Sequence, residues 1–174
     1  MDSFVDINGK VNEMAKARFE SYVEERVAEL AAVKRAKLKA AFDAEVTKVN
    51  RQRDKYIKAA EEGAKALVRK IVEQARKDGC AVGETGAMTS YLSSYAKSAV
   101  NEALGLQPIF NYDTRERLWP EGTAVRKAQD ALMEFDRLCE KETHRVVVYK
   151  MDLGMKPEAF EKMLAEVAEK INKE

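Results

Sequence analysis

The chain has 174 residues, of which 45% are hydrophobic and 35% are charged, and its basic and acidic side chains nearly cancel at a net charge of +1. No apolar run approaches the roughly 18–20 residues that a membrane-spanning helix needs. The start, MDSFVDINGK, lacks the basic and apolar regions of a secretory signal. Two cysteines, Cys80 and Cys139, are too few for a disulfide scaffold and are typical of a reducing compartment. We therefore expect a helical, cytoplasmic protein that does not contact a membrane.

Glycine and proline residues divide the chain into four predicted helices. The first extends from about residue 11 to 78, where a glycine can adopt the left-handed conformation that ends a helix. The second covers residues 85–104, the third begins near residue 123, and the fourth begins at Pro157, a favoured first-turn residue. The segments 104–108 and 153–157 share one pattern, in which Leu-Gly is followed by an apolar residue and then by a proline. This pattern predicts the ends of the second and third helices.

The segment 143–150 is compatible with two secondary structures. Its β-branched residues suit a strand, but Phe135, Leu138, Val146 and Tyr149 keep the spacing of a helix face. We favour a continuous third helix, because no other segment is predicted as a partner strand. The sequence then predicts a mainly α protein, with a coiled-coil-like long helix in residues 1–80 and a smaller helical domain in residues 81–174. An α+β fold with a short strand near 144–150 is the alternative.

Apolar residues of the first helix recur every eleven positions, as in the row Val27, Leu38, Val49, Ala60 and Ile71. Such a period corresponds to about 3.67 residues per turn and favours a nearly straight coil. The helix would be about 100 Å long, whereas the second and third helices laid along it would cover about 70 Å. Either the helix breaks within the polar run 50–54, or part of its apolar stripe packs against another chain. The length therefore predicts a homo-oligomer.

Charge is unevenly distributed along the first helix. Residues 1–33 carry four basic and seven acidic side chains, whereas residues 34–58 carry nine basic and three acidic ones. Five of the basic residues fall opposite the apolar stripe and could follow a nucleic-acid backbone: Lys37, Lys48, Arg51, Lys55 and Lys58. A solvated helix face needs similar charges for solubility, and this is the interpretation that we favour. Nucleic-acid binding by this basic stripe is the alternative.

Residues 106–122 form the longest predicted irregular segment. It contains the aromatic and arginine residues that dominate binding hot spots, namely Phe110, Tyr112, Arg115, Arg117 and Trp119. Long loops of this kind are often functional, so we predict that these five residues contact a partner protein. In the competing interpretation, the apolar residues of the segment, Trp119 among them, pin it onto the helices as a small core.

Signals for chemistry are weak. The single histidine, His144, has no second ligand at metal-binding spacing, and the glycine-rich segment 79–86 lacks the Gly-Lys-Ser/Thr of a phosphate-binding loop. We therefore predict no catalytic residue, metal or cofactor. The sequence favours a non-enzymatic interaction, assembly or scaffold protein that binds itself and another protein. A small-molecule binder, with a pocket between the later helices lined by Tyr91, Tyr95 and the loop aromatics, is a further alternative.

Overall fold

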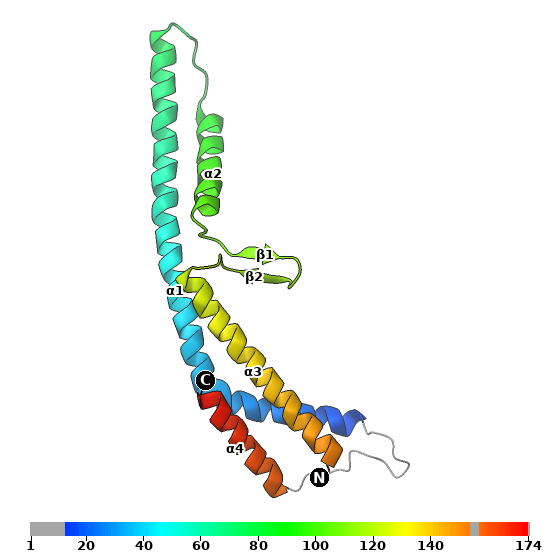
Figure 1. The fold of residues 1–174 in the computed structure, drawn as a ribbon. Coiled ribbons are helices and arrows are strands. Elements are labelled where there is room, and N and C mark those ends of the chain that lie inside the picture. The colour runs from blue at the N-terminus through cyan, green and yellow to red at the C-terminus, as the bar shows by residue number, and fades with distance from the viewer. Residues whose placement is uncertain (1–12, 154–156, 174) are drawn as a thin grey trace. The chain divides into compact units, whose positions relative to one another are not determined.

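The computed structural model describes residues 13–153 and 157–173. Four helices and two short strands follow one another along the chain (Figure 1): α1 (Glu13–Lys77), α2 (Gly86–Ala103), β1 (Ile109–Asn111), β2 (Glu116–Leu118), α3 (Ala124–Leu153) and α4 (Pro157–Lys173). The predicted mainly α fold with a long N-terminal helix is confirmed. Of the two alternatives for the first helix, a break within residues 50–54 does not occur, because α1 is helical from Glu13 to Lys77. Within the described ranges, no helix combines the length and apolar character needed to cross a membrane.

The predicted glycine ends of the first two helices are present. Gly79 and Gly105 have φ angles of 76° and 58°, in the left-handed region that glycine enters without steric cost. After α2, the Leu106 N–H donates to the Asn101 carbonyl at 3.1 Å, which satisfies one of the carbonyls that a helix end leaves free. Leu106 is also buried, as expected of the apolar residue in this motif. The equivalent predicted end at Gly154 lies outside the described residues.

The segment 143–150 belongs to α3, so the alternative of a strand near 144–150 is wrong. A helix satisfies its backbone hydrogen bonds internally, whereas a lone strand would need a partner. Val146 and Val147 are buried within a helical core, which explains the β-branched composition. The only strands among the described residues lie in the segment 106–122, which sequence analysis treated as irregular. There β1 and β2 pair antiparallel, with Phe110 opposite Arg117.

The chain forms two compact units. Unit 1 consists of the described residues up to Ala41 together with those from Asp130 onward, and unit 2 consists of residues 42–129. The helices α1 and α3 contribute to both units. In unit 1 the core combines one face each of α1, α3 and α4, and its members are Phe19, Val23, Val27, Ala31, Phe135, Val146, Val147, Phe160, Met163, Leu164, Val167 and Ile171. The α1 members recur every four residues, which gives the apolar stripe of a core-facing helix.

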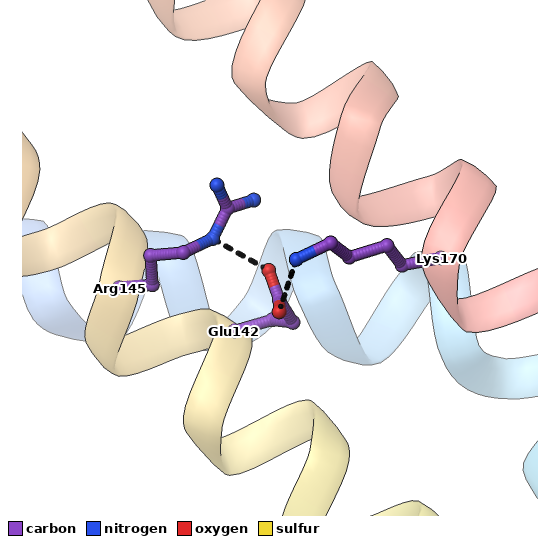
Figure 2. A network of polar contacts seen from close by, with 3 residues as sticks. All are labelled: Glu142, Arg145 and Lys170. Carbon is purple, nitrogen blue, oxygen red and sulfur yellow. Dashed lines mark hydrogen bonds and ion pairs between the residues drawn. The ribbon is translucent and has the colours of Figure 1, made fainter.

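A buried carboxylate links α3 to α4 in unit 1. Glu142 is 2% exposed and accepts hydrogen bonds from Arg145 Nε at 2.7 Å and from Lys170 Nζ at 2.9 Å (Figure 2). Burial alone would raise the pKa of Glu142, but the hydrogen bonds and charges of Lys170 and Arg145 outweigh burial and hold this pKa below its ordinary value. The ionised form of Glu142 therefore stabilises the folded state.

This network predicts a pH-dependent stability difference for Glu142→Gln. A carboxyl group whose pKa is lower in the folded state than in the unfolded state stabilises the fold at pH values above its unfolded-state pKa. This stabilisation is lost as the pH falls through the folded-state pKa. At pH 7 we expect the variant to lose about 1–2 kcal/mol of unfolding free energy, since both cationic partners are partly exposed. The difference should shrink at about pH 3 in urea titrations. Glu169→Gln, at an exposed pair with Lys173, is the control, and an equal deficit of Glu142→Gln at both pH values would contradict the prediction.

Candidate interaction surfaces

The start of α3 fixes the position of the β1–β2 hairpin within unit 2. Trp119, directly after β2, is 6% exposed, and its backbone N–H donates a hydrogen bond to Gln129 Oε1 at 3.0 Å. The Arg126 guanidinium donates to the Trp119 carbonyl at 3.0 Å, and Gln129 Nε2 donates to the Arg117 carbonyl at 2.8 Å. Trp119 therefore holds the base of the hairpin against α3.

The hairpin presents the other four predicted partner-binding residues to solvent. Phe110 is 43% exposed and Tyr112 is 85% exposed, and their ring centroids lie 5.0 Å apart in an edge-to-face arrangement. Arg115, in the turn, and Arg117, on β2, are also exposed. The structure thus separates the predicted set into one packing residue, Trp119, and four accessible ones whose role in partner binding stays a prediction.

In unit 2 the helices α1 and α2 lie side by side and run in opposite directions (Figure 1). Two grooves lie between them. One is lined by Arg53, Asp54, Ile57, Lys58 and Glu61 of α1, by Lys97 and Asn101 of α2 and by Gln107, and the other by Lys65, Val68, Arg69 and Val72 of α1 with Thr85 and Thr89. None of the residues of α2 is buried. Tyr91 and Tyr95 are exposed and line neither of these two grooves, and the pocket predicted around them stays a prediction.

The five residues of the predicted basic stripe, Lys37, Lys48, Arg51, Lys55 and Lys58, are all exposed on α1. Lys48 also pairs with Glu45 on the same helix. Exposure is expected both of a phosphate-binding stripe and of a solvated helix face, so it favours neither interpretation.

A groove of about 460 Å³ lies between α1 and α3 in unit 1. Its lining includes an ion pair, in which Arg35 Nε and Asp136 Oδ1 lie 2.8 Å apart, as well as Cys139 and His144. Burial and the nearby Asp136 carboxylate raise the pKa of the Cys139 thiol. The thiol therefore stays protonated at neutral pH, which makes it a poor nucleophile. No group of three metal-ligating side chains occurs in the part of the chain that the structure describes.

Met88, Tyr91 and Tyr95 have the i, i+3, i+7 spacing that is typical of the core-facing stripe of a helix, so their spacing alone does not mark them as a surface. In the structure they are 47%, 72% and 68% exposed.

Comparison of the chain with protein-family models, with curated proteins and with solved structures found no match.

Proposed function

We propose that the protein is a non-enzymatic interaction and assembly protein, in which unit 1 provides a stable core and unit 2 provides the binding surfaces. The observation that carries this proposal is a contrast between the units. Among the described residues, unit 1 has twelve buried hydrophobic residues and four large hydrophobic ones that are exposed. Unit 2 has six buried ones and ten exposed ones.

This contrast has a direct energetic meaning. Isolated apolar residues on a surface are normal, but a concentration of them marks an interaction site. Each square ångström of apolar surface left in water forgoes about 25 cal/mol of stabilisation. A second protein surface that covers unit 2 recovers this energy without any change in the fold.

The β1–β2 hairpin suits a partner other than the protein itself. Its Phe110–Tyr112 ring pair is exposed, and the buried Trp119 anchors it to α3. Aromatic rings have few rotatable bonds and lose little conformational entropy on binding, and aromatic and arginine side chains are enriched among the residues that dominate binding energy. We propose that Phe110, Tyr112, Arg115 and Arg117 contact a second protein.

Self-association is the part of the proposal that can be tested without knowing the partner. We expect the mass from light scattering to rise above the 19.6 kDa of one chain as the concentration rises into the tens of micromolar. The rise should persist at high salt, because apolar burial is not screened by ions. A protein that keeps the mass of one chain throughout this range would contradict self-association.

A further inference from the structure

The α1–α2 pair has one polar side and one apolar side. On α1, Ile57 and Val68 are buried, and each lines one of the grooves shared with α2. The residues that follow them, Lys58 and Arg69, line the grooves between the helices. The residues that precede them are the exposed Tyr56 and Leu67. Successive residues of a helix are about 100° apart around its axis, so the preceding and following residues lie on opposite flanks.

The same order occurs on α2. The half-buried Thr89 and Ala96 are preceded by the exposed Met88 and Tyr95, and Ala96 is followed by Lys97, which lines a groove. Two antiparallel helices are related by a two-fold axis perpendicular to the plane of the pair. The residues that precede the buried ones therefore lie on the same side of the pair in both helices. This side is the α1–α2 face, consisting of Tyr56, Leu67, Ile71, Met88, Tyr91 and Tyr95.

We infer that the α1–α2 face binds the same face of a second copy of this chain, so that two helical pairs form an antiparallel four-helix bundle. This inference rests on the proposed function and specifies which surface carries self-association and what covers it. A face that meets its own copy about a two-fold axis forms a closed dimer. Four-helix bundles bury apolar residues of all four helices in one core, whereas no residue of α2 is buried within one chain.

The size of the face fits this occupant. Its six side chains are each between 45% and 72% exposed. With aromatic side chains of about 150–250 Å² each, they offer on the order of 600 Å² of apolar surface. A standard interface buries about 800 Å² per partner, and the residues around the six can supply the remainder. None of the six is charged, so the face has no charge with which to select an acidic or a basic partner.

Gly63 supplies an independent observation. It precedes the buried Ala64 and therefore lies on the α1–α2 face, between the turns that carry Tyr56 and Leu67. Glycine inside a helix is less favourable than alanine by about 1 kcal/mol. No close contact within this chain requires a glycine at position 63, because a Cβ atom there would meet no atom within 4 Å. A helix of a second copy that approaches closely at this point would explain the absence of a side chain.

The first experiment compares two neighbouring substitutions on α2 by sedimentation velocity. Tyr95→Glu places a charge on the α1–α2 face and should weaken self-association at least about tenfold. Ser94→Glu adds the same charge about 100° away around the helix, at another exposed position, and should leave self-association unchanged. An oligomer that survives Tyr95→Glu overturns the inference but leaves the proposed function intact. A wild-type protein that never associates overturns both.

A second variant guards against simple unfolding of α2. Gly63→Leu should raise helix stability, since leucine is a better helix former and the position is open within the chain. It should nevertheless weaken association by filling the space that the second copy needs. Helicity by circular dichroism that is kept or increased, together with a lower oligomer fraction, would support the inference. Unchanged association would overturn it.

Hydroxyl-radical footprinting of the wild-type protein gives a test without substitutions. Met88, Tyr91 and Tyr95 should become protected as the oligomer forms, whereas Tyr112 on the hairpin should stay reactive. Protection of Tyr112 with continued reactivity of Tyr95 would overturn the inference. It would show that the copies meet through the hairpin instead, or that the α1–α2 face binds a different protein.

Discussion

Replacing Trp119 with alanine is expected to lower the free energy of unfolding by about 3–5 kcal/mol, because the change empties a buried aromatic site. Trp119 is 6% exposed, and its backbone N–H and carbonyl are both hydrogen-bonded to α3. The variant should lose about 10 °C of melting temperature. Thermal unfolding followed by circular dichroism measures this loss.

Tyr112→Ala is the matched comparison on the same hairpin. Tyr112 is 85% exposed, and substitutions at such sites usually change stability by less than about 0.5 kcal/mol. We expect this variant to unfold as the wild type does but to lose binding of a partner protein. Equal and small effects of the two substitutions on stability would contradict the packing role that the structure gives Trp119. A large loss of stability in Tyr112→Ala would contradict its assignment to a recognition surface.

Phe160→Ala should have an effect of similar size in unit 1. Phe160 is 2% exposed, and its ring centroid lies 5.8 Å from that of Phe19 and 6.0 Å from that of Tyr22, so it joins α4 to α1. Its truncation removes these ring contacts and leaves a cavity, at an expected cost of about 3–5 kcal/mol. Urea unfolding at equilibrium gives the difference in free energy.

Val33→Ala provides the control for this substitution. Val33 lies on the same helix, α1, but is 69% exposed, so its truncation should change stability by less than about 0.5 kcal/mol. Hydrogen exchange of the α4 amides should accelerate in Phe160→Ala and stay unchanged in Val33→Ala. Undisturbed α4 amides in Phe160→Ala would show that α4 does not depend on this aromatic contact.

The ends of the helices could be predicted from the sequence because they depend on local physics. Gly79 and Gly105 adopt the left-handed conformation that a side chain disfavours. Thr123 precedes α3, where its hydroxyl oxygen accepts a hydrogen bond from the Arg126 N–H at 3.2 Å. Pro157 opens α4, since proline has no N–H to leave unpaired in a first turn. Each of these effects involves residues within a few positions of one another.

Burial could not be predicted in the same way, because it depends on residues far apart in the chain. Trp119 and Tyr112 are both aromatic residues of one segment, yet only Trp119 lies against α3. Tyr95 has the spacing of a core residue, but α1 covers only part of the α2 surface. Val146 suits a strand by composition, but it lies on a helix and is buried in a core to which α1 and α4 also contribute. Local conformation was therefore determined by the sequence, whereas the choice of buried and exposed faces was decided by tertiary packing, since a side chain is buried only where another element reaches it.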